Sequence, residues 1–435
     1  MRPSPVIGVD FGTTNTVVSV LGEDGRAELI RFPVEGAHAS TFRSALSFHA
    51  DTDQPTGRVV EAGPWAIETY LEDPGETRFI QSFKSYAASP LFTETTILNR
   101  RYKFEDMLSA FLLRLRAHAG EALAQTPGRV IVGRPVRFAG ASADPALALK
   151  RYEDAFRRLG FTDIRYALEP VAAAFFFARR LTEDATVLVA DFGGGTSDFS
   201  IIRFERRDGR LTSRALGGSG VAIAGDAFDY RIIDHLVSPA LGKGSSYRDF
   251  ANVLPVPPRY YASFARWDQL ALMRASRDMR DIRSLVKKAL EPEKLARLVE
   301  LLDGEHGYPL YQSVSRLKED LSAHEEAVFD FQAGSIALRE TVKRSDFEGW
   351  IGRELAAIDT AVDEAMTGAA LTPEGVDRVF LTGGSSFVPA VRRLFEDRFG
   401  AAKISTGAEL ESIASGLSLI AAEPDLDAWS ERAAS

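Results

Sequence analysis

Two short acidic turns of the sequence contain the residues needed to bind a polyphosphate. The first lies in VIGVDFGTTNTVVSV, residues 6–20, and the second in VLVADFGGGTSDFSI, residues 187–201. Each places an apolar run before Asp-Phe-Gly, continues through Gly, Thr or Ser, and ends in a second apolar run. Glycine permits positive φ and lets backbone N–H groups approach an anion, while Thr hydroxyls add uncharged donors. The pattern therefore predicts two β-hairpins whose turns face phosphate.

The aspartates before these turns, Asp10 and Asp191, have the chemistry of a magnesium site. Mg²⁺ keeps several waters and binds proteins through one or two carboxylates plus phosphate oxygens. Two such hairpins facing each other would hold a polyphosphate from both sides, which explains why one chain would need the motif twice. Either turn alone could be an ordinary tight β-hairpin, so the inference rests on the pair.

The elements around the turns are typical of a two-lobed α/β protein. A chain of 435 residues exceeds the size that one hydrophobic core usually serves. Apolar residues at helical spacing from Met107 to Ala119 predict a helix before a buried strand, VIVGR at 130–134. In the second half, VFLTGG at 379–384 predicts a strand that ends in a glycine pair, followed by a helix from Pro389 to Phe399.

A further helix is predicted at 345–362, where SDFE resembles a capping box ahead of an apolar stripe. Strands interspersed with helices in two halves indicate an α/β protein with a cleft between its lobes.

Composition excludes several classes of protein. With 61 acidic against 52 basic residues, the net charge of −9 argues against nucleic acid and anionic membranes as partners. The absence of Cys excludes disulfide scaffolds and thiol catalysis, and it suits a reducing compartment. The apolar stretch at 171–178 is too short to span a bilayer, and no secretory signal precedes Asp10. We therefore expect a cytoplasmic, monomeric protein with no membrane association.

Five motifs, in this order, resemble the nucleotide-binding domain of the heat-shock protein 70 (DnaK-like) family, within the actin, hexokinase and heat-shock ATPase superfamily. They are VDFGTTNT at 9–16, FKSY at 83–86, LEPVAAA at 168–174, ADFGGGTSDFS at 190–200 with GDAFD at 225–229, and LTGGSSFVPAVRRLF at 381–395. The similarity runs from about Val6 to about Ala422. It implies a two-lobed actin-like ATPase fold of duplicated ribonuclease H-like domains, with ATP or ADP and Mg²⁺ in the cleft.

On this resemblance we assign residues 1–181 and 404–435 to the first lobe and 182–403 to the second, with a helical insertion at about 243–312. Family chaperones continue into a linker, a peptide-binding β-sandwich and a helical lid. No β-sandwich is expected in the residues after Ile420. The expected protein is a nucleotide-controlled unit that serves a separate, unidentified protein partner or client.

The resemblance also implies roles around the phosphates. Residues that would line them are Gly12, Thr13, Thr14 and Asn15 in the first turn and Gly193, Gly194, Gly195 and Thr196 in the second. Asp10 and Asp191 would hold Mg²⁺ through water. The catalytic set would consist of these two aspartates and Thr196 together with Lys84, Glu169 and Asp198. Lys84 matches the lysine that orients the attacking water, Glu169 matches the acid near it, and Asp198 matches a further carboxylate. By residue type alone, Lys84 would be a surface lysine and Glu169 a favourable charge at a helix N-terminus.

The nucleoside side departs from the family pattern. The matching positions are Gly225, Asp226, Ser315, Lys318, Ser322, Gly383, Gly384, Ser385 and Phe387. Ser315 and Glu319 stand where the family has Glu and Arg, and Phe387 replaces an adenine-stacking Arg. A phenyl ring can stack on a base, so base binding is compatible with the change while base selectivity is left open. Pro135 matches a proline proposed to relay nucleotide state, with Arg137 as the nearest counterpart of its partner arginine.

The insertion is basic, since residues 259–297 contain ten Lys or Arg against five Asp or Glu. Two apolar stripes predict two helices, one with Met279, Ile282, Val286 and Leu290 and one with Leu295, Leu298, Val299 and Leu302. Helices packed on the second lobe with solvated charges outside explain this pattern, and a partner site is the alternative. A nucleic-acid site has little support, because the ten basic residues are spread over two helices without a regular series of aromatic residues along them.

The favoured function is an ATP-hydrolysing switch that signals to a partner. Three alternatives stay open: an actin-like filament protomer, a small-molecule kinase on the same fold, and a pseudo-ATPase that binds nucleotide without turnover. A filament needs a self-complementary contact and a kinase needs an acceptor pocket with a base, and the sequence displays neither.

Overall fold

The computed structural model describes residues 6–34, 37–55, 57–124, 128–140, 142–179, 181, 183–207, 210–265, 270, 273–274, 276–405 and 411–433. The chain divides into two compact units. The first comprises Met1–Ala222, Thr360–Ser386 and Phe395–Ser435, and the second Ile223–Asp359 and Phe387–Leu394. Both acidic hairpins lie in the first unit, whereas the predicted lobes contain one hairpin each. The two divisions therefore separate different parts of the chain, and the lobe boundaries stay a prediction.

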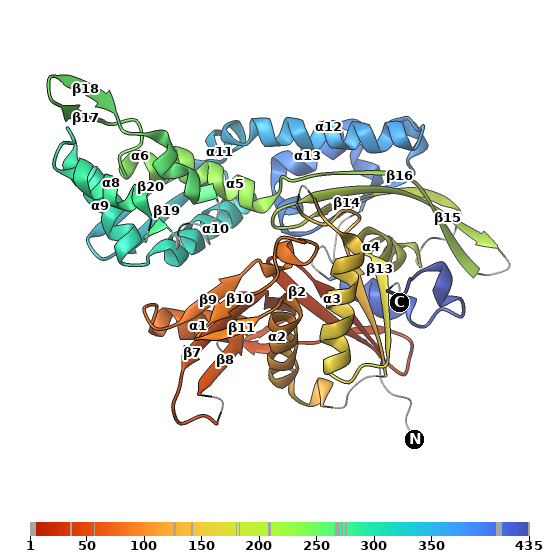
Figure 1. The fold of residues 1–435 in the computed structure, drawn as a ribbon. Helices are drawn as coiled ribbons and strands as arrows, with labels where there is room; N and C mark the ends of the chain where they lie inside the picture. The colour runs from red at the N-terminus through yellow and green to blue at the C-terminus, as the bar shows by residue number, and fades with distance from the viewer. Residues whose placement is uncertain are drawn as a thin grey trace. The chain divides into compact units, whose positions relative to one another are not determined.

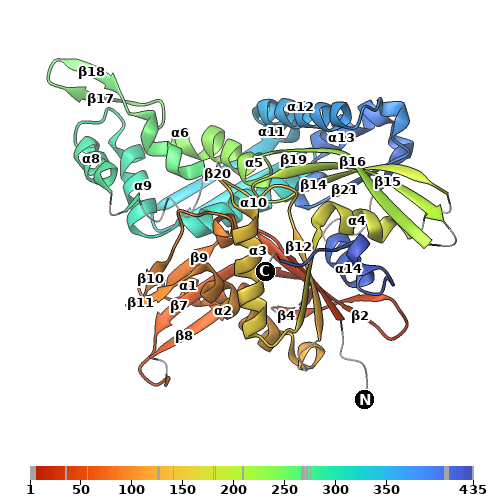
Figure 2. The same ribbon diagram turned by 45° about the vertical axis from the view of Figure 1, so that its right-hand side comes forward.

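The first unit contains two sheets of the same topology (Figures 1 and 2). In one, the order is β3 (Ala27–Leu29), β2 (Asn15–Leu21), β1 (Val6–Phe11), β12 (Arg129–Arg134) and β13 (Asp163–Leu168), and β6 (Thr41–Arg43) pairs additionally with β2. In the other, the order is β16 (Arg210–Val221), β15 (Ser197–Arg207), β14 (Ala185–Phe192), β21 (Arg378–Thr382) and β22 (Ile404–Ser405).

The strand directions also repeat. β1 is antiparallel to β2 and parallel to β12, just as β14 is antiparallel to β15 and parallel to β21. All eight residues of β14 are buried, as expected for a strand covered on both faces. The duplication inferred from two short motifs is therefore a duplication of an entire sheet.

Two helices cross between the sheets. The helix α4 (Glu169–Ala178) follows β13 yet packs on β14 and β15, and α14 (Ser412–Ile420) follows β22 yet packs on β1, β2 and β12. Small residues allow this close approach. A Cβ at Gly8 would lie 2.5 Å from the Ala414 carbonyl oxygen, and a Cβ at Gly416 would lie 1.9 Å from that of Ala172.

The remaining elements of the first half cover its sheet and lead to the site. The predicted helix is present as α2 (Phe104–His118), with its expected apolar residues buried, and α3 (Pro145–Arg158) packs beside it. A three-stranded sheet follows the order β8 (Arg58–Ala62), β7 (Ala45–Ala50), β9 (Arg78–Gln81). Smaller elements are β4 (Phe32–Val34), β5 (Ala37–Ala39), α1 (Pro64–Glu72), η1 (Phe83–Tyr86), β10 (Thr95–Ile97), β11 (Arg100–Tyr102) and η2 (Gly120–Leu123).

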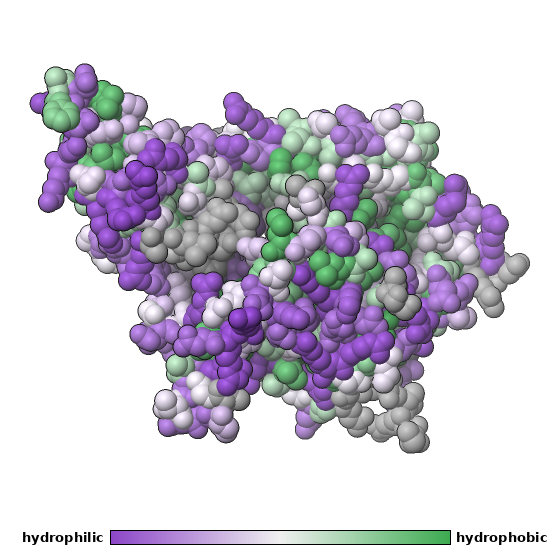
Figure 3. Space-filling view, in the orientation of Figure 1, coloured by the Kyte–Doolittle hydropathy of each residue, from purple (hydrophilic) through white to green (hydrophobic). Residues whose placement is uncertain are grey.

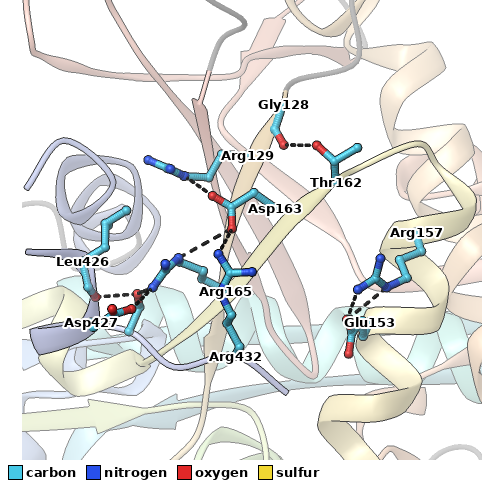
Figure 4. Close-up of polar contacts among 11 residues, drawn as sticks. Gly128, Arg129, Glu153, Arg157, Thr162, Asp163, Arg165, Leu426, Asp427 and Arg432 are labelled. Atoms are coloured by element: carbon cyan, nitrogen blue, oxygen red, sulfur yellow. Dashed lines mark hydrogen bonds and ion pairs between the residues drawn. The ribbon is translucent and has the colours of Figure 1, made fainter. Parts of the chain in front are cut away.

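The C-terminal tail, residues 424–433, runs along the outer edge of β13. Tyr166 and Glu431 form an antiparallel bridge, with N–H···O distances of 2.8 Å in both directions. Arg165 donates to Asp427, and Arg432 donates to Asp163 (Figure 4). The buried Trp429 packs edge-on against Phe175 and also contacts Phe204 of β15. The tail therefore ties the edge of the first sheet to the second sheet.

The second unit is built mainly from helices. It contains α5 (Gly225–Ile232), the π-helical turn η3 (Ile233–Val237), α6 (Ser238–Ala240), β17 (Ser246–Asp249), β18 (Asn252–Pro255), η4 (Pro258–Ala265), α8 (Arg277–Val286), α9 (Pro292–Asp303), α10 (Gly307–Ala323), β19 (Glu326–Ala333), β20 (Ile336–Lys343) and α11 (Arg344–Trp350). The helix α12 (Gly352–Gly368) begins in this unit and ends in the first, and α13 (Pro389–Phe399) does the same. None of the helices within the described ranges is long and apolar enough to cross a membrane.

Two local predictions were wrong. The helix α11 begins at Arg344 rather than after Ser345, and no side-chain hydrogen bond caps it. The Arg344 N–H bonds to the Glu325 carbonyl, so the helix starts directly where the β19–β20 hairpin ends. In the insertion, α8 stops at Val286 and buries Leu285, whereas Leu290 is 51% exposed. Leu290 lies outside the helix, where its N–H donates to the Ser246 carbonyl of β17 beside the Tyr247–Ala289 bridge.

Candidate functional site

Three acidic side chains predicted from the motifs lie at the carboxyl ends of strands in the first unit, and a fourth, Asp198, lies at the start of β15. Asp10 lies near the end of β1, Asp191 near the end of β14, and Glu169 directly follows β13. Burial, and then the charge of Glu169, raise the pKa of Asp10 to about 7 against the opposing charge of Lys84. Burial and the charges of Glu169, Asp10 and Asp198 raise the pKa of Asp191. These side chains therefore act on one another as one electrostatic cluster.

The cation of this cluster is Lys84, which lies in η1 directly after β9. Its Nζ donates to Glu169 Oε1 at 2.8 Å, and the two side chains are only 10% and 9% exposed. Pro170 in the first turn of α4 fixes the helix start, so Glu169 stands at the helix N-terminus. Burial opposes the charged form, but Glu169, Tyr152 and Asp10 together raise the pKa of Lys84. Lys84 is therefore a buried, protonated ammonium rather than a surface lysine.

The turn of the first hairpin, Gly12 to Asn15, is held closed by neighbours. A Cβ at Gly12 would lie 2.2 Å from the Asn15 carbonyl oxygen, so only glycine fits. Ser44 Oγ donates to the Gly12 carbonyl at 2.7 Å, and the Ser44 N–H donates to Thr14 at 2.9 Å. Arg43 donates to Asn15 Oδ1 at 3.3 Å. Arg43 and Ser44 are supports that the sequence motifs did not identify.

The turn of the second hairpin, Gly193 to Thr196, is more open. It is closed by a bond of 2.9 Å from the Gly193 N–H to the Thr196 carbonyl, and a Cβ at Gly195 would meet no atom within 4 Å. Asp198 lies directly opposite Asp191 in the hairpin and accepts from Thr196 Oγ1 at 3.3 Å. Burial and Glu169 raise the pKa of Asp198 to about 7, while Thr196, Lys84 and Arg137 oppose the shift.

The glycine pair after β21 also closes against this hairpin. Gly383 has φ of 83°, and a Cβ there would lie 2.0 Å from the Phe192 carbonyl oxygen. Glycine is therefore required for the end of β21 to approach the end of β14. A Cβ at Gly384 would meet nothing within 4 Å, and Ser385 is buried beside it.

Tyr152 is a site residue that the sequence motifs missed. It lies on α3, is fully buried, and packs edge-on against Phe11. Its hydroxyl has no hydrogen-bond partner within the described residues. Burial raises the pKa of Tyr152, and its hydroxyl is close enough to Lys84 to help raise the pKa of that lysine. The available signal was a tyrosine on the helix face that also contains Ala148, Arg151, Ala155 and Phe156, all of which are buried.

Three of the predicted nucleoside residues lie on α10 of the second unit. Ser315, Lys318 and Ser322 share one face of α10, as their spacing requires. Lys318 Nζ lies 2.8 Å from Asp229 Oδ1, and Ser315 Oγ donates to Asp229 at 3.3 Å. The carboxylate that holds this face is thus Asp229 of α5, which the sequence analysis had not singled out. Ser322 bonds to its own helix at the Lys318 carbonyl.

The other second-unit positions lie in α5 and at Phe387. Gly225 and Asp226 form the first turn of α5, and Phe387 is 50% exposed, so its ring has a free face.

The charges of the site fit a hydrated divalent cation. Among the described residues, no group of three or more His, Cys, Asp or Glu is placed to hold a metal directly. A magnesium ion held through water needs no such group. The raised pKa values of Asp10, Asp191 and Asp198 reflect buried negative charge that Lys84 does not offset. An added cation would relieve it.

The two sheets have the same strand order, and each has an acidic hairpin at the same place. Together with the helices that cross between them, they define an actin-like ATPase fold. The family model described as Hsp70 protein matches residues 81–246 and 305–423. These segments cover more than half of the chain, so the chain belongs to the Hsp70 family, as its motifs predicted. In general terms it is a chaperone-like, ATP-binding protein. Residues 247–304, which include β18, α8 and α9, lie between the matched segments.

Proposed function

We propose that the protein binds Mg·ATP at the two acidic turns of its first unit and hydrolyses it to ADP and phosphate. The nucleotide would act as a conformational switch that a separate protein partner reads. The observation that supports this best is the buried Lys84–Glu169 ion pair among the carboxylates Asp10 and Asp191. Crowded buried charge lowers stability, so it is retained mainly at sites where it serves a function.

Lys84 has the position and charge to act on the transferred phosphoryl group. An ammonium has three donors, and Glu169 accepts one of them. The others remain for the attacking water and a phosphoryl oxygen, where a fixed positive charge stabilises the charge that develops during transfer. Glu169 keeps Lys84 protonated and fixes its direction. Mg²⁺, when bound, would offset the charge of the phosphates.

The two turns would bind the phosphates in different ways. Gly12 to Asn15 offers a rigid turn already fixed by Ser44, and Gly193 to Thr196 offers backbone N–H groups with open space at Gly195. Asp198, opposite Asp191, adds a further carboxylate for ordering water. Roles for Lys318 of α10 and for Phe387 in binding the nucleoside remain predictions from the family resemblance. A cytoplasmic location and a monomeric state remain predictions.

Single-turnover hydrolysis of bound ATP tests the proposal. Orienting water and stabilising developing charge are transition-state tasks, so Lys84→Ala should lower the rate by about 10²-fold while ATP affinity changes only a few-fold. Lys150→Ala, at an exposed lysine paired with Asp154, is the matched control and should change neither quantity. Equal losses of rate and affinity would reduce Lys84 to a nucleotide contact.

Wild-type protein without turnover, but with nucleotide bound after gentle purification, would establish the pseudo-ATPase instead. Sedimentation with ATP separates the filament alternative, which requires ATP-dependent pelleting.

A further inference from the structure

A small β-ribbon of the second unit lies, apart from Ser246, in the segment that the family model does not match. β17 and β18 form a hairpin in which Asp249 pairs with Asn252 across the turn Phe250–Ala251. Residues 288–290 pair with the other edge of β17, because the Arg248 N–H donates to Lys288 and the Leu290 N–H donates to Ser246, both at 2.8 Å. Figures 1 and 2 both show this hairpin extending beyond α8 and α9.

The outer edge of the ribbon, on β18, is available for backbone pairing. Ser246 and Arg248 direct their backbone groups toward residues 288–290, so the residues opposite them, Pro255 and Val253, direct theirs outward. Within the described ranges, no strand pairs with this edge. Proteins usually protect such edges with charge or a covering segment. All four residues of β18 are exposed and none is charged.

The tip of the ribbon has an exposed aromatic residue in an unfavourable backbone conformation. Phe250 is 95% exposed and has φ of 52°, at a hairpin position where glycine is preferred. Val253, Leu254 and Leu290 are 55%, 39% and 51% exposed. Figure 3 shows apolar and polar side chains together on the hairpin at the upper left. Exposed apolar side chains gathered at a strained turn mark an interaction surface rather than a packing element.

The charges beside this surface are positive and unpaired. Arg248 lies on the same ribbon face as Val253, which it opposes, and α8 leads into the ribbon with Arg277, Arg280 and Lys287 exposed. In the part of the chain that the structure describes, these four cations have no ion pair. Their basic neighbours are neutralised: Arg274 pairs with Glu305, Arg283 with Asp303 and Lys288 with Asp249. Of these unpaired cations, Arg248 lies in the ribbon itself and Lys287 directly precedes the residues that pair with β17.

We propose that this ribbon binds an extended acidic segment of a partner protein, which pairs with β18 as an additional strand. Pairing of this kind uses main-chain hydrogen bonds for affinity and side-chain contacts for specificity. Val253 offers an outward N–H and C=O, whereas Pro255 offers only C=O, so the paired stretch is short. Contacts with the Phe250 ring and ion pairs to Arg248 and Lys287 then supply the specificity.

A selection of short random peptides displayed against the full-length chain tests the chemistry of the partner, with Phe250→Gly as counter-selection. The expected consensus alternates apolar and acidic residues. A basic consensus, or one without acidic residues, would overturn the proposal. The proposal would also be overturned if an RNA or DNA oligonucleotide competed for the site with an affinity equal to that of the selected peptide.

The selected peptide, measured by fluorescence anisotropy, then tests the geometry. Phe250→Gly and Arg248→Glu should each weaken binding at least 10-fold or so, as expected for central contacts. N-methylation of the peptide residue that faces Val253 should cause a comparable loss, because it removes a main-chain donor. Binding that tolerates N-methylation along the whole peptide would overturn strand addition.

The controls separate binding from folding. Phe250→Gly relieves the positive φ, so its melting temperature should equal or exceed that of the wild type, and lost binding cannot then reflect unfolding. Leu91→Ala, at a side chain 92% exposed, and Arg31→Glu are matched changes outside the ribbon and should leave peptide affinity unchanged. ATP affinity should be unchanged in every variant. Equal peptide affinity in wild type and Phe250→Gly would refute the proposal.

Discussion

The two acidic hairpins occupy the same place in their sheets, yet they hold different chemistry. Opposite Asp10 in the first hairpin stands Val17, whereas opposite Asp191 in the second stands Asp198. Arg43 and Ser44 hold the first turn closed, while the second has open space at Gly195. The duplicated sheet thus provides a rigid turn in the first hairpin and a more open turn, with a second carboxylate beside it, in the second hairpin. The repeat explains where the site lies, and the differences explain how its tasks are divided.

The largest expected difference concerns the glycines of the two turns. Gly195→Val would place a side chain in open space that phosphate needs, so ATP binding should become undetectable while the melting temperature stays near that of the wild type. Gly12→Val would collide with the Asn15 carbonyl and should lower the free energy of unfolding by about 1–3 kcal/mol or more. Calorimetry and ATP titration measure both. The control is Gly349→Val, where a Cβ also meets open space. Unchanged ATP affinity in folded Gly195→Val would refute the role of the second turn.

Exchanging the residues opposite the two aspartates should have the next largest effect. Asp198→Val makes the second hairpin resemble the first; it should reduce the hydrolytic rate by about 10²-fold and raise stability, because one of several crowded carboxylates is removed. Val17→Asp puts an unpaired charge at a site 3% exposed and should lower the free energy of unfolding by about 3–5 kcal/mol. Denaturant unfolding with single-turnover assays checks the pair. A full hydrolytic rate in Asp198→Val would make the two hairpins equivalent.

A smaller effect is expected at Tyr152, which belongs to the first half. Tyr152→Phe removes a buried hydroxyl that lacks a partner, so the protein should become more stable by about 1 kcal/mol. If the hydroxyl helps to hold Lys84, the hydrolytic rate should fall several-fold with little change in ATP affinity. Tyr102→Phe, at another buried hydroxyl without a partner, is the control and should leave the rate unchanged. Equal rates for Tyr152→Phe and wild type would leave Tyr152 as core packing.

The smallest expected effect concerns the support of the first turn. Ser44→Ala removes the bond to the Gly12 carbonyl and the contact with Thr16 Oγ1, and it should cost about 1 kcal/mol of stability. ATP affinity should fall a few-fold as the turn loosens. Thr196→Ala makes the corresponding change in the second turn and should affect hydrolysis more than stability. The comparison fails if both variants lose stability and rate in the same proportion.

The sequence predicted the duplicated fold because its signals were local. Glycine turns after Asp10 and Asp191 and the apolar runs around them specify each hairpin without reference to distant residues. The nearness of Lys84 to Glu169 followed from family resemblance, since nothing in FKSY alone indicates a buried lysine. Tyr152 and Asp229 were missed because their importance depends on which helices pack together.

The β17–β18 ribbon was missed for a different reason. Hairpin prediction relies on Gly or Asn at positive φ, and here Phe250 occupies that position. Phe250 at this turn position is therefore the reason why the hairpin was not predicted, and it is also the central residue of the proposed interaction surface.

The contacts of α14 and the C-terminal tail also determine how the chain can fold during synthesis. Ser19 in β2 donates to Ala414, which is 395 residues further along, and Tyr166 in β13 bonds with Glu431. While the ribosome is still making the second half, the first sheet therefore has one face without α14 and one edge without a partner. Uncovered edges of this kind lead to misassembly. A member of a chaperone family thus emerges with its first sheet incomplete, and the missing contacts form only after residue 431 has been translated.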